Sequence, residues 1–435
     1  MLAVMLLTLI VPSELFNGRV HDLVANEPSL LYRTLKTALI VSSVLILVWR
    51  SALAARLLRE LNPFQLASVA LMLLSTTWSI EPGITLFKSS LICQILLVSA
   101  AFVLVGWHPR RLQNVLRPVL TVFLVASLIL GALSPNLGRE FGTTVALEGA
   151  WRGVFAQKNA LGDGAALGVV FWLHAWLAKE TGFWRFAAGL GVCIACLIVS
   201  RSSTSMLAAI FVTLLLFLLM KGPTGKRGYV VLLTVLFVAL ILLYSLAVLR
   251  ILPGLDFLLQ PFIALTGKDM TFTGRTQIWD VVKEHIKLHP LLGTGYGAYW
   301  IGPLPRSPSI AAIARYSDYY PGQAHNGYLD VINDLGYVGL VCLLGYIVVY
   351  LRQSLVLLRT DYTLAVLYLT LLFYELICNL TSADWFASIA LNFVITIQVV
   401  FALARGALDC RLLATRTVQS PLPMPRAAVG GPGPL

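Results

Sequence analysis

Eleven long apolar runs constrain the fold of this chain more than any other feature of its sequence. A helix needs about 20 apolar residues to cross the ~30 Å hydrocarbon core of a bilayer. The runs are long enough to cross it, or nearly so, and they occupy residues 34–49, 63–80, 84–106, 115–133, 158–178, 183–200, 204–221, 228–250, 335–351, 363–382 and 386–405. Only 12% of the residues are charged, against about 25% in soluble domains. So little charge excludes a soluble enzyme, a disordered protein and a fibrous repeat.

The first residues form a twelfth, shorter apolar run, which reaches from Met1 to about Phe16. It has no basic segment in front of it, so we expect no cleaved signal peptide. With this run included, the sequence predicts an all-α protein, a polytopic transmembrane bundle of about 12 helices with one long external loop that contains short helices. The predicted order is helices 1–9 in residues 1–250, the external loop in 251–335, helices 10–12 in 336–406 and a disordered tail in 407–435.

Basic residues alternate between the two sides of this bundle. Seventeen of the 32 Lys and Arg residues fall in every second connection or in the tail, namely Arg50, Arg56, Arg59, Arg110, Arg111, Arg117, Lys179, Arg185, Lys221, Lys226, Arg227, Arg352, Arg359, Arg405, Arg411, Arg416 and Arg426. Cytoplasmic loops of membrane proteins are enriched in Lys and Arg. We therefore expect both termini in the cytoplasm and the long loop outside. Because the net charge of +12 is spread over short loops, we expect no nucleic-acid partner.

The predicted external loop, residues 251–335, is about 85 residues long and exceeds ordinary connections by far. Its charges balance, and its many aromatic residues argue against disorder. A helix that Pro290 closes is predicted within it, because Trp279, Val282 and Ile286 share one face at helical spacing. Such a helix would lie along the outer membrane surface or pack on the loop's own core.

Polar residues on the predicted external side gather in four clusters. Placing a polar group at membrane depth costs free energy, so each such residue is a candidate for a functional or structural role. The clusters are Arg152 to Gly162, Ser200 to Ser205, Thr273 to Trp279 with His289 to Gly297, and Ala324 to Asp330. Their basic members are Arg152, Lys158, Arg201 and Arg275. Arg suits phosphate because its planar fork donates two parallel hydrogen bonds, and a His such as His325 can exchange a proton near neutral pH. Together they suggest group transfer from a phosphate-linked lipid donor.

Other interpretations compete at these positions. An external Arg can be an interfacial anchor, and a lone His in a loop can be an ordinary surface residue. Gly293, Gly295 and Gly297 resemble a phosphate loop, but no strand–turn–helix unit surrounds them. His285 and His289 stand at i, i+4 without a third ligand nearby, so we expect no metal. The six cysteines lie in apolar runs or in the tail, so we expect no disulfides.

Three strings in these clusters follow one another in the chain: R-G-x-F-x-x-K-N-x-L-G from Arg152, T-G-R-x-x-I-W from Thr273 and H-N-x-Y-L-D from His325. With the helix count and the late external loop, they make the chain resemble the O-antigen ligase and exopolysaccharide polymerase superfamily of bacterial inner-membrane proteins. The likeness runs over residues 78–339. One departure is Gln157, where many members carry His.

The resemblance implies a glycosyltransferase that uses no metal or other cofactor and acts on polyprenyl-pyrophosphate-linked sugars at the periplasmic face. Carried over by motif, Arg152, Lys158 and Arg275 would bind and neutralise the pyrophosphate. His325 would take the proton from the acceptor hydroxyl. The residues expected to bind substrate are Lys158, Asn159, Arg201, Asn326, Tyr328, Tyr296 and Trp300. The aromatic ones would pack against sugar rings or anchor the chain at the interface.

We expect a polymerase that joins lipid-linked repeat units of an exopolysaccharide. An O-antigen-type ligase, which transfers a finished glycan to another acceptor, would use the same donor and the same residues. A transporter of lipid-linked sugars is disfavoured, because the helices show no matched repeats. The expected partners are the polyprenyl-pyrophosphate-linked oligosaccharide, a glycan acceptor, the lipid bilayer, a chain-length regulator and export proteins.

Overall fold

The computed structural model of the chain is a helical bundle. It describes residues 1–12, 30–140, 149–222, 227–248, 275–302, 307–313 and 320–419. Within these ranges there is no strand, and one isolated antiparallel bridge joins Arg139 to Trp151. The prediction of an all-α polytopic membrane protein is confirmed.

The described helices follow one another with short connections. They are α1 (Leu2–Ile10), α3 (Leu30–Trp49), α4 (Ser51–Glu60), α5 (Pro63–Leu74), the 3₁₀ turn η1 (Ser75–Thr77), α6 (Pro82–Val105), α7 (Arg111–Leu133), α8 (Pro135–Gly138), α9 (Lys158–Leu177), α10 (Phe183–Val199), α11 (Ser203–Lys221), α12 (Arg227–Val248), α14 (Arg275–Leu288), α15 (Pro308–Ile313), α16 (Gly327–Leu357), α17 (Tyr362–Cys378) and α18 (Leu391–Gln419).

The number of spanning helices differs from the predicted twelve. In the described part of the chain, eight helices are long and apolar enough to cross a membrane: α3, α6, α7, α9, α11, α12, α16 and α18. The pair α4–α5 is bent by 99° and makes a ninth if it counts as one span, while α10 and α17 are apolar but only 17 residues long. The described helix of the first run, α1, has nine residues and is about 14 Å long, too short to cross.

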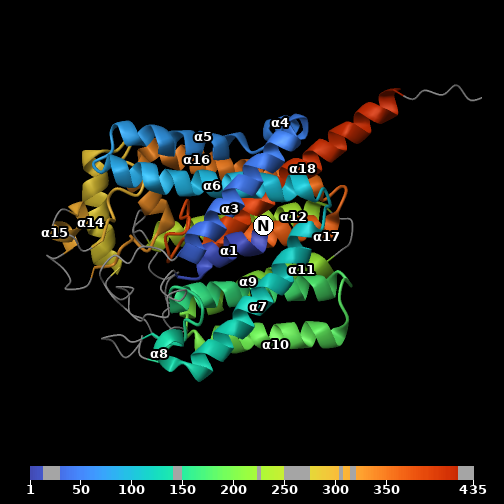
Figure 1. Cartoon of the computed structure of the whole chain (residues 1–435), viewed down its shortest axis with the longest axis horizontal. Coiled ribbons are helices and arrows are strands. Elements are labelled where there is room, and N and C mark those ends of the chain that lie inside the picture. Colours follow the sequence, from blue (N-terminus) through green and yellow to red (C-terminus); the bar gives the residue numbers. More distant parts are fainter. Residues whose placement is uncertain are drawn as a thin grey trace, which may run out of the picture.

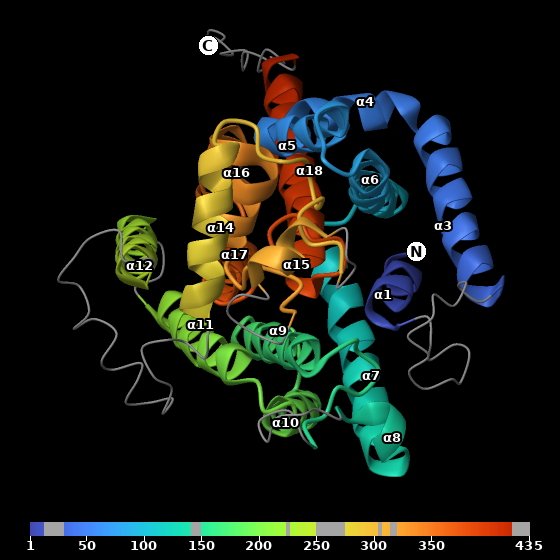
Figure 2. The ribbon, with the colours of Figure 1, turned by 90° about the vertical axis from the view of Figure 1, so that its left-hand side faces the viewer.

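The helices differ sharply in how much of their surface the protein covers. In α18, 89% of the spanning window is buried inside the bundle, whereas in α3 and α12 only 11% is. Figure 2 shows α17 and α18 in the middle, with α3 and α12 on opposite flanks. Because lipid tails are as apolar as Leu side chains, an exposed apolar helix face is stable there. We therefore assign α3 and α12 to the lipid-facing surface and α17 and α18 to the core.

Two short helices lie across one end of the bundle, which we call the α14 end. Figure 1 shows α14 and α15 beyond the ends of the long helices and at a steep angle to them. Trp279, Val282 and Ile286 form the buried face of α14 and pack with Tyr299 and Leu329. The helix predicted from their spacing is confirmed. Of its two predicted environments, the structure shows the loop's own core under the apolar face.

Helix α16 bends at Gly336, where the predicted external loop ends. Gly336 has φ 65° and interrupts the helical backbone. The N–H groups of Tyr337 and Val338 donate instead to the carbonyls of Pro290 and Leu291, at 2.8 and 3.2 Å. The turn after α14 is thus hydrogen-bonded into the bend. As a result, the first two turns of α16 belong to the α14 end.

Candidate functional site

His325 sits in a strained turn immediately before α16. Its φ is 53°, a left-handed conformation that costs a non-glycine residue of order 1 kcal/mol. The residues on either side of it, Ala324 and Asn326, are held in place by hydrogen bonds. The carbonyl of Ala324 accepts a hydrogen bond from Nε1 of Trp279 at 2.9 Å, and the N–H of Ala324 donates to the carboxylate of Asp330 at 3.0 Å. The side chain of Asn326 caps α16 by accepting from the N–H groups of its first turn. The surrounding structure therefore holds the His325 turn in place.

Arg275 is the first residue of α14, and it lies close enough to His325 for its charge to act on the imidazole. Burial, and then the positive charge of Arg275, together lower the pKa of His325 to about 4. Burial also lowers the pKa of Arg275, while the nearby Tyr244 on α12 acts in the opposite direction. At neutral pH the site therefore holds a neutral imidazole next to a guanidinium. The structure brings together these two residues, which are 50 positions apart in the sequence.

A second group of predicted residues comes from the segment before α9 and from the α10–α11 turn. The Nε of Arg152 donates to the carbonyl of Leu137 at 3.0 Å. The N–H of Lys158 donates to the carboxylate of Glu140, and the charges of Glu140 and Arg201 both act on the Lys158 ammonium. Arg201 is exposed, as is Asn159. Lys158 and Arg201 therefore form a pair of cations that Glu140 partly offsets.

Hydrogen bonds connect this second group to His325 through intervening segments. The N–H of Trp151 donates to the carbonyl of Val199 at 3.0 Å, which fixes the segment before α9 to the end of α10. Thr204 on α11 bonds to Thr381 at 3.3 Å. The N–H of Ala383 then donates to the side chain of Gln323 at 3.2 Å. Both groups of predicted residues consequently lie at the α14 end, which faces the viewer in Figure 2.

The aromatic residues predicted to bind substrate make internal contacts. The hydroxyl of Tyr296 donates to the carbonyl of Phe386, and Tyr296 is 7% exposed. Nε1 of Trp300 donates to Asp330 at 2.8 Å. The hydroxyl of Tyr328 donates to the carbonyl of Leu376 at 3.3 Å. These three side chains brace the loops around His325; Tyr296 is buried, and Trp300 and Tyr328 are half-buried.

Lys88 on α6 supports the same loops and was missed by the sequence analysis. Its Nζ donates to the carbonyl of Gly297 at 2.6 Å and lies near the carboxylates of Asp330 and Asp334. Gly297 has φ 66°, and a Cβ there would lie 2.3 Å from Cδ of Lys88. The glycine-rich segment therefore serves close packing. A lone Lys inside an apolar run was the signal that could have found this contact.

Glu375, deep in the apolar run 363–382, supports the loop between α17 and α18. Its Oε1 accepts from Nδ2 of Asn379 at 3.0 Å. Oδ1 of Asn379 accepts from the N–H groups of Asp384 and Trp385, at 2.9 and 2.8 Å. A Cβ on Gly327 would lie 1.9 Å from that same oxygen. This packing explains the Gly that follows His-Asn in the sequence.

Metal-binding residues do not gather in the part of the chain that the structure describes. No group of three His, Cys, Asp or Glu residues there could hold a metal ion. Nδ1 of His285 pairs with the amide oxygen of Asn333 at 2.7 Å. The six cysteines are free thiols.

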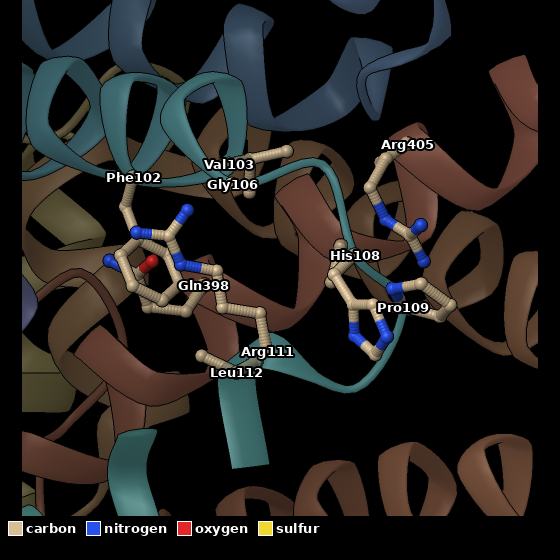
Figure 3. A pocket seen from close by; sticks show the side chains of 10 residues that line it. Phe102, Val103, Gly106, His108, Pro109, Arg111, Leu112, Gln398 and Arg405 are labelled. Atoms are coloured by element: carbon tan, nitrogen blue, oxygen red, sulfur yellow. The ribbon is translucent and has the colours of Figure 1, made fainter. Parts of the chain in front are cut away.

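A separate hollow lies at the opposite end of the bundle, where the α6–α7 connection meets α18. Its empty space of about 260 Å³ includes open solvent, so it is a shallow hollow and not an enclosed cavity. Figure 3 shows Arg111 turned toward Phe102 and Arg405 turned toward His108, on different sides of the hollow. The guanidinium of Arg111 stacks 4.7 Å from the centre of the Phe102 ring, and that of Arg405 pairs with Asp409 at 3.0 Å. The two cations do not converge on one point, so this hollow is not a second candidate site.

Part of the chain is similar to known proteins. Residues 188–344 match the family model described as O-antigen ligase. The match covers about a third of the chain. Over 201 residues the chain is also 33% identical to the exopolysaccharide production protein ExoQ of Rhizobium meliloti (strain 1021), and the match covers 44% of this chain and 43% of ExoQ. The chain thus matches less than half the length of that relative. The family predicted from the three motif strings is confirmed.

The segment that matches the O-antigen ligase family contains most of the candidate site. Arg201, Arg275 and His325 lie inside it, with the bracing aromatic residues. Arg152 and Lys158 lie before it. The Arg275–His325 pair is therefore the part of the site that both the family match and the geometry include.

Proposed function

We propose that this multi-pass membrane protein is a glycosyltransferase that polymerises polyprenyl-pyrophosphate-linked repeat units into an exopolysaccharide at the periplasmic face. The pairing of Arg275 with a neutral His325 at one end of the bundle carries this proposal. The similarity to ExoQ, whose name describes exopolysaccharide production, supports polymerisation over other uses of such a site. The partners proposed with it are the lipid-linked oligosaccharide, a glycan acceptor, a chain-length regulator and export proteins.

The reaction joins an acceptor oxygen to the anomeric carbon of the donor sugar. As that bond forms, the bond between the sugar and the pyrophosphate breaks, and its electron pair stays with the pyrophosphate. Arg275 neutralises the charge that builds up there, helped by Arg152, Lys158 and Arg201 from the same end of the bundle. Fixed cations in a site shielded from water are usually the largest contribution to such catalysis. Because side chains supply this charge, we expect chelators of divalent metals to leave turnover unchanged.

A ligase is the second candidate, and the family description favours it directly. Product length separates the two functions. Purified protein in vesicles receives a lipid-linked repeat unit on its outer surface only, and the glycan is sized on a gel. A ladder of lengths supports polymerisation, whereas a single transfer to a different acceptor supports ligation. If no glycan is transferred at all, both functions are contradicted. Transport of the lipid-linked sugar across the membrane is then the activity to measure.

A further inference from the structure

The side chain of Gln323 lies between His325 and the loop that joins α17 to α18. Its Oε1 accepts a hydrogen bond from the N–H of Ala383 at 3.2 Å, and its Nε2 lies 3.3 Å from Nδ1 of His325. A backbone N–H can only donate. Turning the amide around would set the NH₂ group against the N–H of Ala383 and lose that bond. Ala383 therefore fixes the orientation of the Gln323 amide.

The amide orientation decides which nitrogen of His325 carries the proton. An amide NH₂ group has two donors and no acceptor, so Nδ1 of His325 must be the acceptor and must be unprotonated. Burial and the charge of Arg275 lower the pKa of His325 to about 4, which leaves the ring neutral at neutral pH. A neutral imidazole with an unprotonated Nδ1 carries its proton on Nε2.

We propose that His325 acts in the reaction as a hydrogen-bond donor through its Nε2–H, and that Gln323 is the positioning residue that holds it in this form. The inference rests on the proposed function. A base would need an unprotonated nitrogen that faces the acceptor hydroxyl, but the lone pair of Nδ1 is engaged by Gln323. A donor N–H next to the guanidinium of Arg275 instead suits the oxygens of a pyrophosphate.

This role changes where the acceptor's proton goes. His325 and Arg275 hold the pyrophosphate while the acceptor oxygen bonds to the anomeric carbon and the old bond breaks. The departing pyrophosphate keeps the electron pair of that bond, and its oxygens become more basic. They take the proton of the acceptor hydroxyl, so polyprenyl pyrophosphate leaves with it. His325 neither gains nor loses a proton over the cycle.

Nitrogen NMR of the full chain with ¹⁵N-labelled histidine tests the proposal without any substrate. The His325 signals are assigned by their loss in His325→Gln. We expect the unprotonated nitrogen of His325 to be Nδ1 in the native protein. In Gln323→Glu the carboxylate keeps the bond to Ala383 and can only accept, so the ring proton should move to Nδ1. The signals of His289, which is exposed at the same end, should stay unchanged. An unprotonated Nε2 in the native protein, or an unmoved proton in Gln323→Glu, overturns the proposal.

Turnover then tests the donor role itself. His325→Gln keeps an amide nitrogen close to the position of Nε2 but supplies no base. We expect it to lose clearly less turnover of a lipid-linked repeat unit than His325→Ala, which should lose ~10²-fold. Equal losses in the two variants overturn the donor role. If the native protein itself transfers no glycan, the proposed function fails, but the NMR result on Gln323 and His325 stands by itself.

Discussion

Arg275 is half-buried near His325, so water screens its charge less than at an exposed position. Replacing Arg275 with Ala removes a cation from the point where the pyrophosphate is proposed to bind. We expect turnover to fall ~10²-fold, the loss typical for one charge-stabilising donor. Arg275→Lys keeps the charge without the planar fork and should lose less. Turnover of purified, correctly inserted protein on a lipid-linked repeat unit measures both changes.

Lys287→Ala is a matched control on the same helix. Lys287 lies near the other end of α14 and pairs with Glu284 on the surface, where its side chain is 69% exposed. Exposed pairs of this kind contribute about 0–1 kcal/mol. We expect unchanged turnover and stability in this variant. Full turnover of Arg275→Ala would contradict the assignment of the pyrophosphate to Arg275.

The titration of His325 can be measured directly. Its pKa of about 4 lies below the ordinary value of 6.5, chiefly because of burial and then because of Arg275. The unfolded chain therefore binds a proton at higher pH than the folded chain does, and the stability contributed by neutral His325 is lost as pH falls toward 4. We expect the NMR titration of His325 to have its midpoint near 4, and Arg275→Leu to raise it only partly. A midpoint near the ordinary value would contradict the burial of the ring.

Sequence patterns could locate the chemistry of the site but not its hydrogen bonds. Arg275 and His325 stand out as polar groups in motif strings of the long external loop, and the structure places them close enough for the charge of Arg275 to act on His325. The partners of His325 could not be predicted, because Gln323 depends on Ala383, about 60 residues away in another loop. Packing of this kind comes from the tertiary fold and has no local signature in the chain.

At the scale of elements, the bend in α16 depends on Gly336. A Cβ there would lie 2.1 Å from the carbonyl oxygen of Leu291, and the φ of 65° is unfavourable for Ala. We expect Gly336→Ala to destabilise the α14 end by about 1–3 kcal/mol. Its thermal unfolding should begin earlier, and turnover should fall because the turn after α14 supports the His325 region. Differential scanning fluorimetry and the turnover assay measure the two effects.

Gly191→Ala provides the control for Gly336→Ala. Gly191 lies within α10, and a Cβ there would meet nothing within 4 Å. Ala favours a helix over Gly by about 1 kcal/mol, so this variant should be equally or more stable. A Gly336→Ala protein as stable as Gly191→Ala would show that the bend tolerates a side chain.

Helix positions followed from the apolar runs, whereas helix lengths and bends did not. All eleven long runs contain a helix in the structure. A hydropathy pattern does not distinguish a full span from the shorter α10 and α17, because burial inside the bundle and contact with lipid favour the same residue types. Nor does it show the 99° bend between α4 and α5, since Asn62 and Pro63 mark a turn without fixing its angle.

At the scale of the whole molecule, the two ends of the bundle differ in their charges. Away from the α14 end, Arg110 pairs with Glu180 at 2.6 Å and with Asp361 at 3.4 Å, and Arg117 pairs with Glu180 at 2.7 Å. These contacts connect three loops that the sequence places on the cytoplasmic side. The ion pairs thus lie at the end of the bundle that carries these basic loops, and the proposed orientation rests on the basic residues alone.

Labelling of single cysteines tests this orientation. Lys287 and Thr360 are both exposed, at the α14 end and in the α16–α17 connection respectively. Each is changed to Cys in a chain that carries Cys410→Ser, because the thiol of Cys410 is exposed. A maleimide that cannot cross membranes is added to intact spheroplasts. We expect it to label Lys287→Cys at once and Thr360→Cys only after the membrane is opened, since the positive loops should face the cytoplasm.

The native Cys410 supplies an independent control for the C-terminal side. In the otherwise unchanged chain it should behave like Thr360→Cys and react only in opened membranes, because α18 ends on the side of the basic loops. Labelling of Thr360→Cys and Cys410 in intact spheroplasts, with Lys287→Cys protected, would place the α14 end in the cytoplasm. The Arg275–His325 site could then not act at the periplasmic face, and the proposed reaction would have to be abandoned with the orientation.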